Sequence, residues 1–162
     1  MGLVGRTTVM VCGPGAMLGH LFLEDLQPGD GVWSLAGDGT LATGIVEAVS
    51  DKLRPVYEIE LDDGLIAARS DLDQRFLEYV YRSSKINWTK LQKLYVGCYL
   101  VAKKPDTAAV NRPFTKPYEK YFPDTVYPAK ITRLKPAGVG AVRAVRVSQT
   151  HNFFGNGIVC HA

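Results

Sequence analysis

The chain closes on the stretch His151-Asn152-Phe153-Phe154-Gly155-Asn156-Gly157-Ile158-Val159-Cys160-His161-Ala162, and this stretch decides the fold. Residues 157–161 form a short, mostly apolar run that begins at a glycine, which predicts a β-strand. Residues 142–147, just upstream, have the same strand-like character. The sequence therefore ends on two predicted strands, and the second carries His161 next to the final residue, Ala162.

The same pattern recurs through the rest of the chain. Short apolar-alternating runs are broken by Gly, Pro and Asp, which is typical of a protein built from many short strands. The turn at residues 62–64 predicts a hairpin, because its glycine can adopt positive φ at no steric cost. Strands are predicted over residues 7–11, 30–35, 43–49, 56–61 and 65–68.

One short helical segment is predicted within this pattern. Trp88, Leu91 and Leu94 recur at a spacing of three, which predicts one or two helical turns before Gly97. No long amphipathic helix is visible elsewhere in the sequence. The chain is therefore predicted to be all-β, with many short antiparallel strands.

Residues 104–128 differ in composition from the rest. They hold five of the nine prolines, with several aromatic residues between them. Repeated proline excludes a regular strand or helix, so this segment is predicted to be an extended connection. Its aromatic residues predict that it packs on the domain.

Length and charge limit the classes of function. A chain of 162 residues fits a single domain, 1–162, with a sizeable core. The net charge of +3, without a dense Lys/Arg run, argues against nucleic-acid binding. No apolar run approaches the ~20 residues of a membrane span, and no secretory signal is visible. We therefore expect no membrane contact and a cytoplasmic location.

The cysteines predict no special chemistry. Three cysteines at unrelated spacings favour neither a disulfide framework nor a zinc site, and no cofactor is expected. Cys12 and Cys98 are expected to be small buried hydrophobes. Cys160 faces the core or the neighbourhood of His161 by strand alternation, and we interpret it as an inert buried thiol.

The N-terminal segment carries a second motif. Gly5, Thr7 and Val9 stand at intervals of two, and residues 23–30 read Leu-Glu-Asp-Leu-Gln-Pro-Gly-Asp. Together with the terminal stretch, these motifs resemble the intein (Hint) family of self-splicing domains over nearly the whole chain. The resemblance implies a flat, horseshoe-like β fold whose two chain ends meet at one active site. Residues 104–128 then stand where larger members carry a homing endonuclease, which implies a mini-intein.

The resemblance also implies a mechanism. In the family, a first Cys or Ser attacks the preceding carbonyl, a nucleophile downstream takes over the acyl group, and a terminal Asn cyclises. His161 would donate a hydrogen bond to the downstream carbonyl, and His151 would shuttle protons near neutral pH. The implied partners are flanking sequences in cis, or the two halves of a split element. A monomer is expected.

Two departures block that mechanism. Counting back from Gly5 puts the first nucleophile at Gly2, which has no side chain. Ala162 occupies the terminal Asn position and has no carboxamide. Natural loss explains either change alone, whereas both together favour deliberate inactivation. Ala144 stands where the family often has Asp or, in one class, Cys, so neither of those groups can assist.

A third departure concerns the family's Thr-x-x-His motif at the upstream junction. Residues 69–76 contain no histidine. Counting forward from the hairpin turn puts Ser70 and Asp73 on the two motif positions. Counting back from the following phenylalanine puts Asp71 and Gln74 there instead.

The two registers differ in chemistry. Gln74 could donate a hydrogen bond but could not deliver a proton. Asp73 could do acid/base work only if burial favoured its protonated form. The similarity of Asp-Gln-Arg-Phe to the family's Asp-His-x-Phe favours Gln74. The alternative that neither side chain acts stays open.

Three functions are compatible with the sequence. The first is autocatalytic splicing in cis, a single-turnover reaction rather than an enzyme acting on a free substrate. The second is a cleavage-only autoprocessing domain of the Hint type. The third is a catalytically idle binding module on the same fold.

Overall fold

The computed structural model describes residues 1–13, 17–62, 66–104 and 125–162. Twelve strands and two 3₁₀ turns make up the regular structure of these residues. In chain order they are β1 (Leu3–Val4), β2 (Thr8–Gly13), β3 (Met17–Phe22), η2 (Leu23–Asp25), β4 (Gly31–Leu35), β5 (Leu41–Leu61), β6 (Ile66–Ser70), β7 (Arg75–Val80), β8 (Lys85–Lys90), η3 (Leu91–Lys93), β9 (Tyr99–Lys103), β10 (Val126–Val147), β11 (Asn152–Gly155) and β12 (Ile158–His161).

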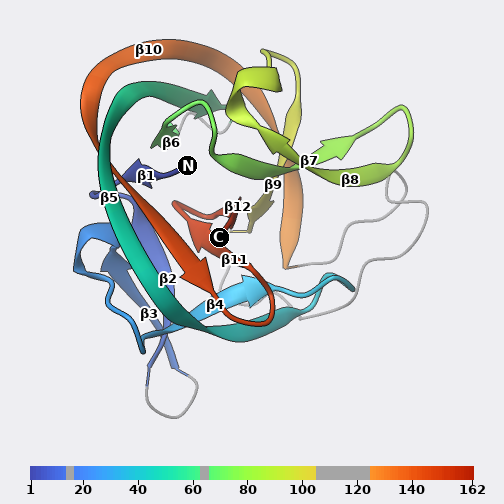
Figure 1. The fold of residues 1–162 in the computed structure, drawn as a ribbon. Helices are drawn as coiled ribbons and strands as arrows, with labels where there is room; N and C mark the ends of the chain where they lie inside the picture. Colours follow the sequence, from blue (N-terminus) through green and yellow to red (C-terminus); the bar gives the residue numbers. More distant parts are fainter. Residues whose placement is uncertain (14–16, 63–65, 105–124) are drawn as a thin grey trace.

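Two long strands, β5 and β10, form the frame of the molecule. They pair antiparallel from Leu61 and Ile131 at one end to Val46 and Val147 at the other. Register shifts interrupt the ladder, one of them beside Pro136, and such bulges bend a strand pair. Figure 1 shows the result as a wide arc around the centre of the molecule. The predicted horseshoe-like, all-β fold is confirmed.

The length of these two strands corrects the sequence prediction. Residues 43–49 and 56–61 were expected to be separate strands, but the intervening residues continue the ladder against β10. The Lys-Leu-Arg-Pro sequence at 52–55 resembles a loop between two strands, because most of its side chains are exposed to solvent. Leu53 and Val139 are 75% and 74% exposed there. A two-stranded ribbon needs no buried alternation, so its residues carry no strand pattern.

The Proline-rich segment is described only at its ends. Residues 105–124 lie outside the described residues, so the predicted packing of the aromatic side chains can be followed only at Tyr127, which is partly buried against the hydrophobic core. The N–H of Lys104 donates to the carbonyl of Thr125 at 3.0 Å, which brings the two ends together. The prediction that proline excludes a strand is wrong at Pro128, which pairs with Val101 inside β10. The fixed φ of proline is compatible with extended backbone.

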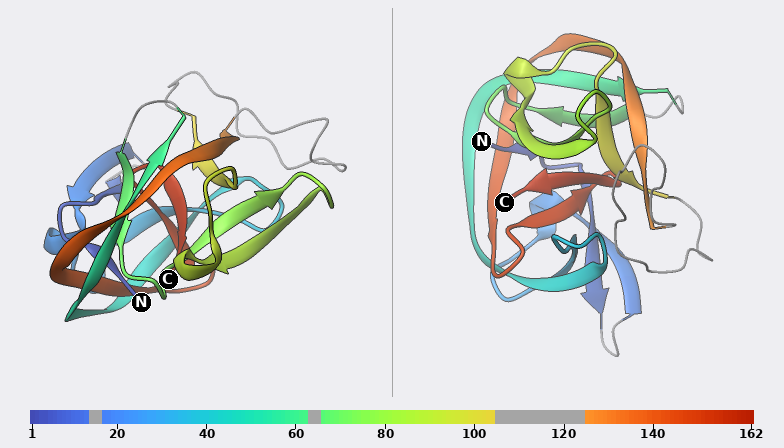
Figure 2. Two further views of the ribbon diagram at one scale, coloured as in Figure 1. Left: turned by 90° about the horizontal axis from the view of Figure 1, so that it is seen from above. Right: turned by 90° about the vertical axis from the view of Figure 1, so that its right-hand side faces the viewer.

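The terminal hairpin, β11 and β12, lies at the centre of the arc (Figures 1 and 2). Its turn is the pair Asn156-Gly157, both at positive φ (49° and 82°), as a two-residue hairpin turn requires. The hairpin contacts β2 on one side and β7 and β9 on the other. It is therefore an interior pair of strands rather than an edge.

Alternation along this hairpin places side chains on two faces. Phe153, Ile158 and Cys160 join the larger hydrophobic cluster, which also receives Leu3 and Phe76. The neighbouring residues of the hairpin face a smaller cluster, which comprises Met10, Leu35, Leu77, Tyr79, Val101, Val126, Phe154 and Val159. The hairpin thus separates two halves of the core, and its register decides which of its side chains enter each half.

Other local predictions need correction. The helical turn predicted from residue 88 onward is limited to η3, while Trp88 itself lies in strand β8. The strands at 17–22, 75–80 and 85–90 were not predicted. Cys98 and Cys160 are buried as expected, but Cys12 is only partly buried. Among the described residues, no helix is long and apolar enough to cross a membrane.

Candidate functional site

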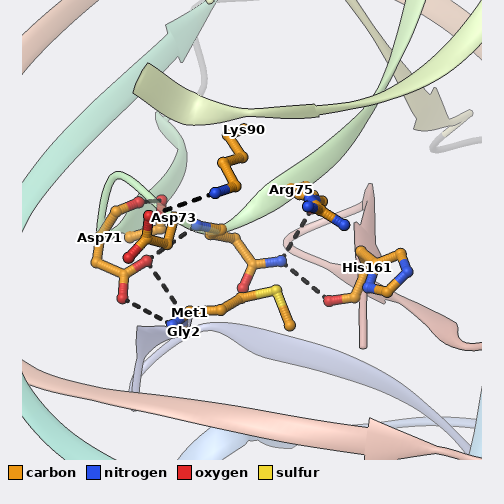
Figure 3. Close-up of polar contacts among 9 residues, drawn as sticks. Met1, Gly2, Asp71, Asp73, Arg75, Lys90 and His161 are labelled. Carbon is orange, nitrogen blue, oxygen red and sulfur yellow. Dashed lines mark hydrogen bonds and ion pairs between the residues drawn. The ribbon is translucent and has the colours of Figure 1, made fainter. Parts of the chain in front are cut away.

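The two chain ends meet beside the loop that joins β6 to β7. Gly2 directly precedes β1, which pairs with β6 and β10. His161 ends β12, which pairs with β7. Both views in Figure 2 place the termini close together, and Figure 3 shows residues 71–75 between them. Residues that are about 160 positions apart in sequence therefore share one site.

Asp71 holds the upstream end. Its Oδ1 accepts hydrogen bonds from the N–H of Gly2 (3.2 Å) and from the N–H of Gln74 (2.9 Å). In return, the N–H of Asp71 donates to the carbonyl of Gly2 at 3.1 Å. Asp71 is buried, and its Oδ2 lies 3.2 Å from the amino nitrogen of Met1 without making a hydrogen bond. Both backbone groups of Gly2 are thus bound to one residue.

Gln74 connects this end to the other. Its side chain is almost fully buried, at 2% exposure. Nε2 donates to the carbonyl of Arg75 (2.9 Å) and to the carbonyl of His161 (3.0 Å). A continuous path of hydrogen bonds therefore runs from Gly2 through Asp71 and Gln74 to His161.

The other candidate register sends neither of its side chains to the chain ends, although the backbone of Ser70 pairs with Leu3. Ser70 is buried, and its hydroxyl donates to the carbonyl of Asp71 rather than to either terminus. The side chain of Asp73 is 52% exposed and lies 3.9 Å from the amine of Lys90 (Figure 3). The geometry brings Asp71 and Gln74 to the site and leaves Ser70 and Asp73 outside it.

Gly2 is packed tightly against β10. A Cβ atom at this position would lie 2.9 Å from the carbonyl carbon and oxygen of Arg143 and 3.2 Å from the nitrogen of Ala144. These neighbours are backbone atoms, which cannot rotate away. A side chain at position 2 therefore requires the backbone before β1 to shift.

His161 sits in a half-buried position under Trp88. The ring centroids are 5.0 Å apart and the planes meet at 86°, an edge-to-face contact. Burial lowers the pKa of His161, and the positive charges of Arg75 and His151 lower it further. The site thus favours the neutral form of His161 and leaves its buried Nδ1 without a hydrogen-bond partner among the described residues.

His151 and Ala162 meet through their backbones. The N–H of Ala162 donates to the carbonyl of His151 at 2.8 Å. His151 has φ of 55°, an uncommon value for a residue other than glycine, and its side chain is exposed. The structure therefore places all three candidates of the downstream end, His151, His161 and Ala162, within one small region.

The arrangement of strands matches solved inteins over almost the whole chain. An intein from a hyperthermophile superposes with a TM-score of 0.78 at 14% identity, covering 99% of this chain and 99% of that one. A variant of the Ssp DnaB mini-intein superposes with a TM-score of 0.76 at 18% identity, covering 99% and 98%. The chain has the intein fold.

A bacterial intein-like domain from Clostridium thermocellum shares this intein fold, with a TM-score of 0.71 at 14% identity, covering 99% of this chain and 96% of that one. No protein-family model and no curated protein sequence matches the chain. The likeness is therefore one of fold, and the chemistry must be argued from the residues.

Cys160 is unreactive in this intein fold. It is fully buried between Phe76 and Phe153, its two strand partners, and burial raises its pKa to about 12. A thiol with that pKa carries almost no thiolate at neutral pH. The described residues also contain no group of three or more His, Cys, Asp or Glu side chains able to hold a metal ion.

Three residues that shape the site have roles that were not predicted from the sequence. Asp71 appeared only as one of two alignments, and its carboxylate contact with Gly2 was not expected. Trp88 comes from a hairpin with no local connection to His161. Asn152 is buried and makes three side-chain hydrogen bonds, two to Leu35 and one to Thr150. Only Asn152 had a local signal, as a polar residue in an apolar strand.

Proposed function

We propose that this chain is a protein-splicing element of the intein type, blocked at both bond-breaking positions. The observation that carries the proposal is the hydrogen-bond path from Gly2 through Asp71 and Gln74 to His161. Splicing requires both junctions in one site, so that an acyl group can pass from one to the other. A fold chosen only for binding has no need to join its two ends.

The downstream end supports the same conclusion. An Asn at position 162 would have to bond its side-chain nitrogen to its own carbonyl carbon, while the bond to the next residue breaks. The released nitrogen takes up a proton, and a hydrogen bond to the carbonyl oxygen stabilises the developing charge. Nδ1 of His161, which has no partner among the described residues, can supply that bond when it carries the imidazole proton. Ala162 lacks the attacking nitrogen.

The upstream end lacks its nucleophile. Gly2 has the backbone contacts to Asp71 that would orient the preceding peptide bond, but no hydroxyl or thiol to attack it. We therefore infer that upstream acyl transfer is blocked in this chain. The loss of the nucleophilic side chain goes together with the tight contact between Gly2 and β10, which leaves no space for a Cβ atom at position 2.

The proposal extends to the whole chain. We propose that residues 1–162 form one splicing domain and that residues 104–128 occupy the insertion position of larger inteins. The substrate is the pair of flanking segments in cis, and we expect a monomer without cofactor, acting in the cytoplasm. Each chain would carry out the splicing reaction once, on its own flanks, and would not act as an enzyme on a free substrate.

The cleavage-only alternative is favoured by the likeness to the intein-like domain from Clostridium thermocellum. The idle binding module is favoured by a cavity of about 810 Å³ between β1 and the bend of β5 and β10. Its charged lining is largely engaged in internal ion pairs, because Glu58 lies 2.8 Å from Arg69 and 3.2 Å from Lys135. Such a lining leaves few charged groups free to bind a charged ligand, so we prefer splicing.

Restoring each junction alone tests the proposal. With a downstream flank attached, Ala162→Asn should release that flank, while Ala162→Gly should not. With an upstream flank attached, Gly2→Cys should make its release dependent on an added thiol, while Gly2→Ala should not. Release at both junctions supports splicing. Release only upstream supports the cleavage-only alternative, and release at neither junction supports the binding module.

A further inference from the structure

Resting on the proposed function, we propose that Asp71 is the proton carrier of the upstream step, in the role that a histidine fills in the family. The chain has no histidine in residues 69–76. Gln74, which the sequence favoured for this place, uses its side-chain N–H groups on the carbonyls of Arg75 and His161. Its amide also cannot exchange a proton with a reacting group near neutral pH.

Asp71 touches the atom that leaves in this step. The bond that breaks joins the carbonyl carbon of residue 1 to the nitrogen of residue 2. Oδ1 of Asp71 lies 3.2 Å from that nitrogen and already accepts its N–H. A general acid must lie within hydrogen-bond reach of the atom that it protonates, and Asp71 meets this condition.

The second oxygen of the carboxylate faces residue 1. Oδ2 is buried and forms an ion pair with the amino nitrogen of Met1 across 3.2 Å, without a hydrogen bond. When an upstream flank is joined to Met1, that amine becomes a peptide N–H and the ion pair is lost. Oδ2 then faces the residue whose carbonyl is attacked, which is where a base is needed.

The carboxylate can carry one proton through the whole step. A Cys or Ser at position 2 forms a bond from its sulfur or oxygen to the carbonyl carbon of residue 1, and its proton passes to Asp71. The carbon–nitrogen bond then breaks, and the same proton passes from Asp71 to the nitrogen of residue 2. Asp71 returns to its starting state, and no further reactant is needed.

The neighbouring acid provides a matched comparison. Asp73 lies two residues away in the same loop, but its side chain is mostly exposed and is paired with Lys90. Neither of its carboxylate oxygens contacts the chain ends. A charge effect of the loop as a whole would involve both acids, whereas proton transfer to the nitrogen of residue 2 involves only Asp71.

The test uses the full chain with an upstream flank, Gly2→Cys, and Ala162 kept, so that only the upstream step runs. Strand pairing begins at Leu3, so the backbone at position 2 can make the small shift that a Cβ requires. The rate of flank release by added thiol is measured for this parent and for versions that also carry Asp71→Asn, Asp71→Thr, Asp71→Glu or Asp73→Asn. Thermal unfolding confirms that each variant is folded.

We expect Asp71→Asn and Asp71→Thr to slow release by about 100-fold or more, the usual contribution of a general acid or base. Both replacements keep an acceptor for the N–H of residue 2, so a loss that they share reports proton transfer. Asp71→Glu should recover part of the rate, and Asp73→Asn should match the parent. If Asp71→Asn unfolds the loop, the remaining two variants test the role of Asp71: flank release should be faster in Asp71→Glu than in Asp71→Thr.

Two results would overturn the inference, and they differ. Equal rates for the parent and Asp71→Asn would remove the role of Asp71 and leave the proposed splicing function intact. No release from the parent itself, with Asp71 present and the protein folded, would instead contradict the proposed function, and the role of Asp71 with it.

Discussion

The side-chain amide of Gln74 donates a hydrogen bond to the carbonyl oxygen of His161 across 3.0 Å. This bond joins the loop between β6 and β7 to the last strand of the chain. The same loop binds the first residues through Asp71. One loop therefore fixes both ends of the chain, and its polar contacts are mostly buried, where unpaired groups are costly.

Gln74→Ala should lower the free energy of unfolding by about 1–3 kcal/mol, because two carbonyls in the site lose their donor. Gln74→Glu should cost at least as much, since a carboxylate would face both carbonyls. Gln92 lies in the neighbouring turn with an exposed side chain, and Gln92→Ala is the control. Chemical denaturation of the three variants measures the difference. Equal costs at positions 74 and 92 would show that the bond to His161 contributes nothing.

Arg143→Ala should destabilise the fold by about 2–4 kcal/mol. Its guanidinium donates to both carboxylate oxygens of Asp51 and to the carbonyls of Leu23, Glu24 and Leu26, which ties η2 to the long ribbon. Arg143→Lys should not restore this stability, because an ammonium cannot reproduce the fork.

Arg146 supplies the control for this prediction. It lies on the same strand and pairs with Glu47, but both side chains are exposed. Arg146→Ala should change the free energy of unfolding by less than about 1 kcal/mol, as expected for a surface ion pair. A loss of similar size at positions 143 and 146 would contradict the structural role of Arg143.

Gly2→Ala should also destabilise the fold, by about 1–3 kcal/mol, because the new methyl group meets the backbone of Arg143 at 2.9 Å. Gly37 provides the comparison, since a Cβ there meets nothing within 4 Å and its φ is not positive. Gly37→Ala should be neutral or slightly stabilising. Thermal unfolding of both variants measures the effect, and an unchanged midpoint for Gly2→Ala would show that position 2 has room.

His161 should make stability depend on pH. Burial, with Arg75 and His151, lowers its pKa below the usual value of 6.5 in the folded state. Between that lowered pKa and 6.5, the unfolded chain binds more protons at this residue than the folded chain does. Stability from this source is therefore fully present above pH 6.5 and is lost as the pH falls through that window.

His161→Gln should remove this part of the pH dependence, whereas replacement of the exposed His20 by Gln should leave it unchanged. Denaturation at a series of pH values between 5 and 8 compares the variants. Parallel curves for the parent and His161→Gln would show that the imidazole is not kept neutral by the fold.

Much of the fold could be predicted from local signals. The apolar run at residues 157–161 predicts the last strand, and the recurring short runs predict an all-β fold. Strand β11 and the Asn156-Gly157 turn were not predicted, although Asn-Gly is a common hairpin turn. The join between residues 49 and 56 could not be predicted, because a solvated ribbon tolerates Arg54 and Pro55 without a buried face. Similarly, Trp88 gives no sign in the sequence that its ring lies against His161.

The site shows the same division. Gly2 and Ala162 could be located by counting from motifs, since chain distance fixes their place. The choice between Asp73 and Gln74 could not be made by counting, because a difference of one residue in the length of the turn exchanges the buried and exposed positions. Only the strand pairing that begins at Arg75 sets which side chain faces inward.

The most direct test joins both restorations in one chain. Gly2→Cys with Ala162→Asn, flanked upstream and downstream, with a Cys or Ser at the first downstream position, should yield the two flanks joined by a peptide bond. Intact-mass and fragment spectra would identify the junction, and the freed element should appear in equal amount. If the doubly changed chain folds yet gives no joined flanks, the chain is not a blocked splicing element.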